Sequence, residues 1–235
     1  RKYTIFLKDG LDLVAAHGVS VWPRCCSVIL DCLASLFDRC ELPLARVQAD
    51  STQGDQSVTE GLEVLHRGRF LELRKQGRWE YVSRYGATGS VHVLAVTDAR
   101  ELLLVEQYRV PVQSRTLELP AGVIGDEAAH RGESPESCGA RELEEETGYR
   151  PAQVSLLQVS PSAPGLSSEI QHLVRAEGLT RVSSGGGVDG EDITVHRVPL
   201  AGHAQWLAEA AERRGLLLDH RIHAALYHLN ADSGA

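Results

Sequence analysis

The sequence has no run of five or more lysine and arginine residues, and its net charge is −8 over 235 residues. Clusters of basic side chains supply most of the affinity for nucleic acids, so we expect no nucleic-acid partner. The sequence also lacks a long apolar run, because the longest, about residues 25–37, contains Asp31. A membrane-spanning helix needs roughly 20 apolar residues, so we expect no membrane partner.

Methionine is absent, and cysteine is unevenly distributed. The fifth cysteine is Cys138, and the other four lie within the first forty residues: Cys25, Cys26, Cys32 and Cys40. Their number and spacing predict neither a disulfide framework nor a zinc site, so we expect reduced thiols and a cytoplasmic location. Because position 1 is not methionine, we expect that the chain does not begin at a translation start.

The composition changes near residue 50, where ADSTQGDQS (49–57) forms a polar stretch rich in turn-forming residues. We expect residues 1–57 to be an N-terminal extension of one of three kinds: an appended segment, a processed leader or upstream sequence. The patterns of the folded domain begin after it.

Beyond residue 57 the pattern predicts short strands, then one helix, then strands and two helices. RFLELRKQGRWEYVSRY (69–85) alternates around Gln76-Gly77 and predicts a hairpin. TLELPAGVIG (116–125) predicts a strand that enters a Pro/Gly loop. Other strands are predicted within 90–109, 154–162, 169–179 and 193–200, and other helices within 204–214 and 220–230. This order is typical of an α/β fold whose mixed sheet is covered on both faces.

RELEEETGY (141–149) places four glutamates within six positions, at the end of a helix predicted over 134–147. Residues four apart share a helix face, so Glu142 and Glu146 lie one above the other, with Glu145 beside them. Either this face is exposed to solvent, or a divalent cation that prefers oxygen ligands, such as Mg²⁺, offsets the repulsion.

The same segment resembles the signature of the Nudix hydrolases, in which a glycine, a glutamate and the motif R-E-apolar-x-E-E-x-G follow at fixed spacing. The matching residues are Gly122, Glu133, Arg141, Glu142, Leu143, Glu145, Glu146 and Gly148. The family pattern implies that Arg141 pairs with Glu133 to orient the helix. Ten residues separate Gly122 from Glu133 where the family has five, so we expect EAAHR (127–131) to be a loop insertion that leaves the helix intact.

Further segments resemble one branch of this family, the ADP-ribose pyrophosphatases and related nucleotide-sugar hydrolases. They are RWEYVSR (78–84), VEQYR (105–109), ELPAG (118–122), Pro164 in APGLSSE, and GVDGEDITVHRV (187–198). The resemblance implies an α/β/α sandwich with a mixed β-sheet over 87–235. A small antiparallel β subdomain over 58–86 would precede it and serve dimerisation and base binding. The resemblance further implies that the protein is a homodimer and that it hydrolyses a small nucleoside diphosphate sugar.

The resemblance also implies roles for the acidic residues. Glu142 and Glu146 would bind Mg²⁺, or Mn²⁺ in its place, together with the backbone carbonyl of Ala121. Glu145 would be a third ligand or a close neighbour of the ligands.

For the substrate, the resemblance assigns Arg84 and Arg109 to the diphosphate or the terminal ribose. Planar guanidinium groups suit that role because they meet phosphate oxygens with two hydrogen bonds. Trp79 and Phe70 occupy positions that stack adenine in the family, although a tryptophan in a strand is also a common core residue. Glu118 is a candidate contact of the ribose.

SSGGGVDGED (183–192) combines three consecutive glycines with three carboxylates, and such a loop can bring a base to the attacking water. Glu191 matches the acidic position of the family's loop, Asp189 is the alternative, and Asp192 lies next to the following strand. The implied reaction is Mg²⁺-dependent hydrolysis of ADP-ribose to AMP and ribose 5-phosphate. The alternatives are another nucleoside diphosphate sugar, such as UDP-glucose or GDP-mannose, and a domain that binds ADP-ribose without cleaving it.

A chain that begins at Val58 should stay soluble, dimeric and active, because residues 1–57 lie outside the implied active site. Size-exclusion chromatography and turnover of ADP-ribose, compared with the full chain, measure this. Precipitation or loss of turnover would show that residues 1–57 belong to the domain.

Overall fold

The computed structural model describes residues 61–188 and 190–233. The extension predicted for residues 1–57, with its four cysteines, lies outside the described residues, and so does Asp189. The elements in chain order are β1 (Leu62–Arg67), β2 (Leu71–Gln76), β3 (Trp79–Arg84), β4 (Gly89–Ala95), β5 (Glu101–Arg109), η2 (Val110–Val112), β6 (Ser114–Glu118), β7 (Ala121–Ile124), η3 (Ala128–His130), α2 (Pro135–Thr147), β8 (Tyr149–Arg150), β9 (Gln153–Pro161), β10 (Ile170–Glu177), β11 (Thr180–Arg181), β12 (Thr194–Pro199), α3 (His203–Arg214), β13 (Leu217–Leu218) and α4 (Arg221–Ser233). Within this described part, no helix is long and apolar enough to cross a membrane.

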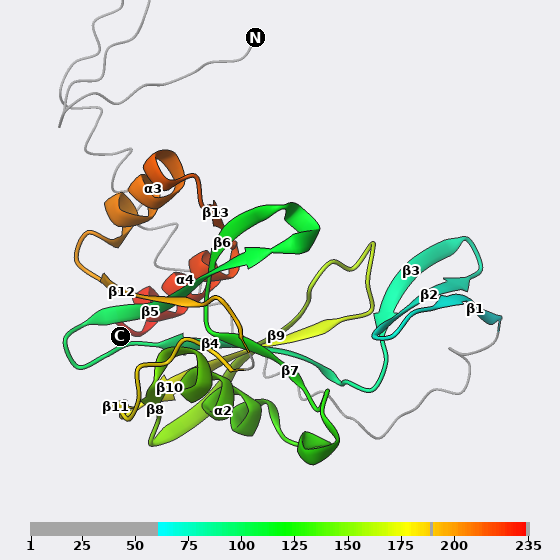
Figure 1. The fold of residues 1–235 in the computed structure, drawn as a ribbon, viewed down its shortest axis with the longest axis horizontal. Helices are drawn as coiled ribbons and strands as arrows, with labels where there is room; N and C mark the ends of the chain where they lie inside the picture. Colours follow the sequence, from blue (N-terminus) through cyan, green and yellow to red (C-terminus); the bar gives the residue numbers. More distant parts are fainter. Residues whose placement is uncertain (1–60, 189, 234–235) are drawn as a thin grey trace, which may run out of the picture. The chain divides into compact units, whose positions relative to one another are not determined.

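Two four-stranded sheets, with strand orders β7-β4-β10-β9 and β12-β5-β6-β13, form the centre of the fold. Both sheets are mixed, because β4 lies parallel to β10 and β13 lies parallel to β6, whereas the other neighbours are antiparallel. Helix α2 lies on one side of the sheets, and α3 and α4 lie on the other (Figure 1). The predicted α/β class, with mixed sheets covered on both faces, is confirmed.

Single strands supply side chains to two cores. In β4, Val91 and Val93 belong to the core that includes Leu143 of α2, whereas Leu94 belongs to the core that includes Ile222 of α4. Successive strand residues point to opposite faces of a sheet, which is why one apolar strand serves both sides. Leu143 fixes α2 on this core, and the neighbouring face of the helix carries Glu142 and Glu146.

Capping residues define both ends of α2. The Ser134 hydroxyl accepts a hydrogen bond from the N–H of Ser137 at 3.2 Å. Gly148 has φ 77°, in the left-handed region, and its N–H donates to the carbonyl of Glu144. A Cβ at Gly148 would also overlap with the backbone of Ser183, so glycine is required for conformation and for space. The helix predicted over 134–147 is confirmed.

The segment Ala121–Ile124 differs from its prediction. The sequence predicts a loop, but the segment forms β7, with Ala121 opposite His92 and Gly122 opposite Val91 on β4. The prediction is wrong because Pro and Gly indicate a break, whereas pairing with the edge of a buried strand decides the outcome for so short a segment. The insertion at 127–131 contains one 3₁₀ turn and leaves α2 intact, as expected.

Strands β1, β2 and β3 form a separate antiparallel sheet. The predicted hairpin is confirmed, with Gln76 opposite Trp79 across the turn. The loop that follows β9 attaches to this sheet. The N–H of Val82 donates to the carbonyl of Leu166 at 2.9 Å, and the carbonyl of Val82 accepts from the N–H of Ser168 at 3.1 Å. The small antiparallel β subdomain is therefore part of the fold.

Candidate active site

Helix α2 holds two carboxylates against strand β7. Glu146 is only 4% exposed, and its Oε2 accepts a hydrogen bond from the N–H of Ala121 at 3.0 Å. Glu142 lies against Gly122, where a Cβ would overlap with the carboxyl carbon of Glu142. Only a glycine at position 122 leaves room for this carboxylate, which explains why the motif needs a glycine there.

Burial of these carboxylates changes their pKa values. Burial raises the pKa of Glu146 well above its ordinary value, although the hydrogen bond from Ala121 opposes this, and Glu142 and Glu191 add repulsion. Burial raises the pKa of Glu142 to about 7, against the opposing effect of the Arg141 charge. One buried and one half-buried carboxylate that repel each other are a set of oxygen donors that fits a hard divalent cation such as Mg²⁺.

Arg141 joins the acidic residues around the start and middle of α2. Its guanidinium lies 3.2 Å from Glu133, 2.9 Å from Glu142 and 3.2 Å from Glu145. Glu133 also accepts the N–H of Gly125 at 3.1 Å, which ties the base of the inserted loop to the helix. The predicted Arg141–Glu133 pair is confirmed. Among the described residues, no three or more His, Cys, Asp or Glu side chains are grouped so that they could hold a metal ion.

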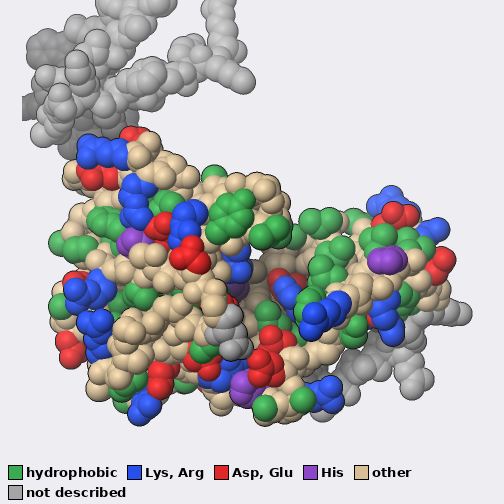
Figure 2. All heavy atoms as spheres, viewed as in Figure 1, with side chains coloured by type: hydrophobic (Ala, Val, Ile, Leu, Met, Phe, Trp, Pro, Cys, Tyr) green, Lys and Arg blue, Asp and Glu red, His purple; other side chains and the backbone are tan. Residues whose placement is uncertain are grey.

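Four of the candidate substrate and metal residues line one open cavity of about 420 Å³: Arg84, Arg109, Glu118 and Ala121. Basic and acidic side chains gather around a hollow near the middle of the face shown in Figure 2. The remaining lining residues are Ser90, His92, Pro111, Val112, Thr116, Gly122, Val123, Glu169, Asp219 and Arg221. Ala121 and Gly122, which contact the two buried carboxylates, are thus part of the cavity wall.

Arginine–carboxylate pairs shape this wall. Arg109 donates from Nε and Nη2 to the two oxygens of Glu118, at 2.8 and 2.7 Å. Glu118 is buried and also accepts the hydroxyl of Thr116. Arg84 contacts Glu169 at 3.1 Å. A guanidinium held by a carboxylate keeps a fixed direction and still has unused N–H groups for a ligand.

Three ionisable residues of the cavity wall carry no motif signal in the sequence: His92, Asp219 and Arg221. Arg221 donates to Asp219 from Nε at 2.7 Å and lies 2.9 Å from Nε2 of His92 through Nη1. Burial, and then the positive charge of Arg221, lower the pKa of His92 to about 3, so the imidazole is neutral. The available signals were a histidine inside an apolar strand and an aspartate just before a predicted helix.

The two aromatic candidates lie apart. Trp79 is 53% exposed and lines a second hollow, of about 330 Å³, together with Pro164. Phe70 is 62% exposed and precedes β2 at the other end of the hairpin. The register from Leu71–Arg84 to Gln76–Trp79 spans six residues, roughly 20 Å at the usual rise of a strand. The structure therefore does not bring Trp79 and Phe70 together within one chain.

The glycine-rich loop is anchored on the C-terminal end of α2. The N–H of Gly186 donates to the carbonyl of Glu146 at 2.8 Å, and the N–H of Gly187 donates to the carbonyl of Glu145 at 3.1 Å. Beyond these anchors, Glu191 accepts the N–H of Val188 at 3.2 Å and lies close enough to Glu146 to raise its pKa. The glycines thus hold the loop to the helix that carries the acidic residues.

Asp192 and Cys138 have other roles. The carboxylate of Asp192 is exposed and lies 2.8 Å from Nη1 of Arg115, which also contacts the buried Glu106 at 2.7 Å. Cys138 is fully buried in the core beneath α2, and burial raises the pKa of its thiol. It is therefore a packing residue.

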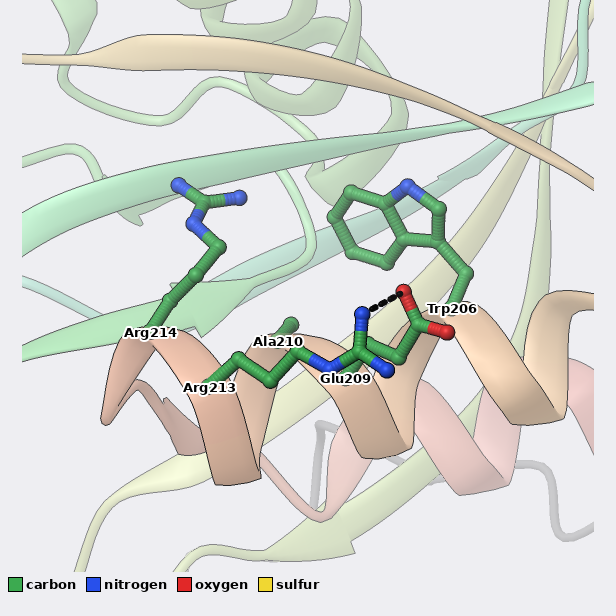
Figure 3. A pocket seen from close by; sticks show the side chains of 5 residues that line it. All are labelled: Trp206, Glu209, Ala210, Arg213 and Arg214. Carbon is green, nitrogen blue, oxygen red and sulfur yellow. Dashed lines mark ion pairs between the residues drawn. The ribbon is translucent and has the colours of Figure 1, made fainter.

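A further hollow, of about 130 Å³, lies on α3 and contains none of the candidate residues. Its side chains all come from this one helix (Figure 3), and Arg213 pairs there with Glu209 at 3.6 Å. Arg214 reaches the buried Glu106 of β5. The Arg214–Glu106 contact joins α3 to the sheet, the Arg213–Glu209 pair lies within the helix, and neither suggests a ligand.

Comparison with known proteins finds similarity in sequence and in fold. The family model described as NUDIX domain matches residues 87–213. An ADP-ribose pyrophosphatase of Bacillus subtilis is 40% identical over 92 residues, which cover 39% of this chain and 47% of that protein, so the chain spans about half of that relative. An ADP-sugar pyrophosphatase of Mus musculus is 33% identical over 215 residues, which cover 79% of this chain and 94% of that protein.

Two other matches extend this comparison. A GDP-mannose pyrophosphatase of Cronobacter sakazakii is 30% identical over 190 residues, which cover 74% of this chain and 92% of that protein. A crystal structure of an ADP compounds hydrolase is similar with a TM-score of 0.57 at 24% identity, covering 72% of this chain and 90% of that chain. The last match concerns the fold alone.

Replacing Glu146 with glutamine should stabilise the metal-free protein at pH 8. The glutamine side chain can still accept the hydrogen bond from the N–H of Ala121, but it carries no buried charge. Because the pKa of Glu146 is raised in the fold, its carboxyl is protonated at low pH and costs stability only as the pH rises. We expect a gain of about 1 kcal/mol or more, or roughly 2–4 °C in Tm per kcal/mol, that shrinks toward pH 5.

Thermal unfolding with a chelator at both pH values measures this gain. Glu144→Gln is the control, since Glu144 pairs with Arg150 on the surface and its replacement should bring no such gain. An unchanged or lower Tm for Glu146→Gln at pH 8 contradicts the prediction.

Proposed function

Because this chain belongs to the Nudix hydrolase family, we propose that it hydrolyses the diphosphate of ADP-ribose to AMP and ribose 5-phosphate, with Mg²⁺ as cofactor. One observation carries the proposal: the buried Glu146 and the half-buried Glu142 lie against Ala121 and Gly122, on the wall of a cavity that also holds Arg84 and Arg109. A diphosphate needs both a cation and hydrogen-bond donors, and this wall offers groups suited to each.

Glu142 and Glu146 would hold the Mg²⁺, with the carbonyl of Ala121 and with Glu145 as a third ligand or a close neighbour. The bound cation, or Mn²⁺ in its place, would offset the negative charge of the diphosphate. Arg109 and Arg84 would donate to the phosphate oxygens and orient them, and Glu118 would keep Arg109 in place or contact the ribose.

Glu191 is the proposed base. In the reaction a water oxygen bonds to one phosphorus, the bond from that phosphorus to the bridging oxygen breaks, and the proton of the water passes to the carboxylate of Glu191. The proximity of Glu191 to Glu146 supports this role. Asp189 is the alternative base.

The exposed ring of Trp79 beside Pro164 would stack the adenine, and Phe70 would contribute only from another chain, because it lies at the far end of the hairpin. Stacking of one adenine between both rings would therefore require a homodimer. We further propose a cytoplasmic location, in keeping with the cysteine usage of the sequence.

Another nucleoside diphosphate sugar is the second candidate substrate, and the similarity to a GDP-mannose pyrophosphatase favours it. Turnover of ADP-ribose, GDP-mannose and UDP-glucose with Mg²⁺ separates the candidates. ADP-ribose should give the highest kcat/KM. No turnover of any of them would favour a domain that binds ADP-ribose without cleaving it.

Glu146→Gln should lower kcat on the best substrate by roughly 10²–10⁴-fold, because it removes a carboxylate from the proposed cation site. Steady-state kinetics at saturating Mg²⁺ measure this loss, and Glu144→Gln, on the solvent side of the same helix, should keep full activity. Turnover near that of the wild type for Glu146→Gln would contradict the assignment of this face.

Glu191→Gln should lower kcat by about 10²-fold or more with little change in KM, since it removes the base but no phosphate contact. Asp192→Asn should be mild, because Asp192 pairs with Arg115 outside the cavity. Kinetics of both variants and of Asp189→Asn decide the assignment. If Asp189→Asn loses activity and Glu191→Gln keeps it, the base is Asp189 and not Glu191.

A further inference from the structure

Arg221, the first residue of α4, lies on the same cavity wall as Arg109. Asp219 accepts from its Nε and Nη2, and His92 lies 2.9 Å from its Nη1. A guanidinium carries five N–H groups, so three are used and one remains on each terminal nitrogen. These two donors belong to a side chain whose direction is fixed from both sides.

Arg109 has the same kind of arrangement. Its Nε and Nη2 donate to Glu118, so three of its five N–H groups remain. Its hydrogen bonds with Glu118 raise the pKa of Arg109, and the charges of Glu146 and Asp219 raise it further. Arg109 is thus within electrostatic reach of both the buried carboxylates of α2 and the Asp219–Arg221 pair.

Taken with the donors that remain unused, this arrangement is suited to an anion with several oxygens. The two guanidinium groups keep five free N–H groups on one wall, and the neighbouring His92 is neutral and adds no charge of its own. Planar forks held in advance lose little side-chain entropy when they bind phosphate oxygens.

We propose that Arg221 is a substrate-binding residue that grips the diphosphate together with Arg109, and that Asp219 positions it. The proposal rests on the proposed function and extends it to a residue outside the family motif and from a different part of the chain. The competing role is structural: Arg221 would only neutralise Asp219, whose side chain is 10% exposed and whose Oδ1 accepts the N–H of Arg221 at the start of α4.

Calorimetric titration with inorganic pyrophosphate in Mg²⁺ buffer separates the two roles. Arg221→Gln should weaken binding roughly 10- to 100-fold, as expected for the loss of charge-assisted hydrogen bonds. The double variant Asp219→Asn/Arg221→Gln removes the ion pair as a whole and leaves no stray buried charge, so it also keeps the test valid if Arg221→Gln alone fails to fold. It should bind as weakly as Arg221→Gln. Arg150→Gln is the matched control, because Glu144 holds Arg150 in the same two-bonded way on the surface, and its affinity should be unchanged.

Wild-type affinity in the double variant would overturn the proposal and assign Arg221 a structural role. Absence of pyrophosphate binding by the wild-type chain would overturn it as well. If the chain binds pyrophosphate through Arg221 but turns over no nucleoside diphosphate sugar, the proposed function is contradicted. The role of Arg221 in binding the diphosphate is then still supported.

Discussion

The burial of two carboxylates of α2 against strand β7 is the constraint on which the rest of the site depends. Glu146 finds the N–H of Ala121, and Glu142 fills a space that only a glycine at position 122 leaves open. Burial penalises both charges, and their proximity adds repulsion. A chain selected for stability alone has no reason to keep such a pair, whereas a chain that binds a divalent cation does.

The surroundings of this pair limit its cost without removing its charge. Arg141 offsets part of the negative charge from the helix side. At the C-terminal end of α2, the amides of Gly186 and Gly187 satisfy carbonyls that would otherwise lack partners. The same loop carries Glu191, so the proposed base and the proposed cation ligands share one support.

The parts of the site that depend on local spacing could be predicted from the sequence. The helix follows from residues a few positions apart, the Arg141–Glu133 pair was implied by the family pattern, and the structure has both. The loop predicted at Ala121–Ile124 is a strand because the partner strand β4, about thirty residues upstream, decides its conformation.

Contacts between distant segments could not be predicted in the same way. His92 and Arg221 are 129 positions apart and meet only after β4 and α4 have packed. The separation of Trp79 from Phe70 depends on the register of the hairpin, which places the two residues at opposite ends of the paired strands. The alternation of apolar and polar residues alone does not fix that register. Motif residues were therefore found, whereas His92, Asp219 and Arg221, which complete the cavity wall, were not.

Thermal unfolding of the full chain during a titration with Mg²⁺ at neutral pH tests most directly whether the buried pair is a cation site. A ligand that binds only the folded state raises Tm with its concentration. The wild-type Tm should rise and then level off, and the rise should be lost in Gly122→Ala, whose Cβ displaces the carboxylate of Glu142, but not in Gly165→Ala, where a Cβ meets open space. A wild-type Tm that does not respond to Mg²⁺, or an equal response in Gly122→Ala, would contradict a cation site built on Glu142 and Glu146.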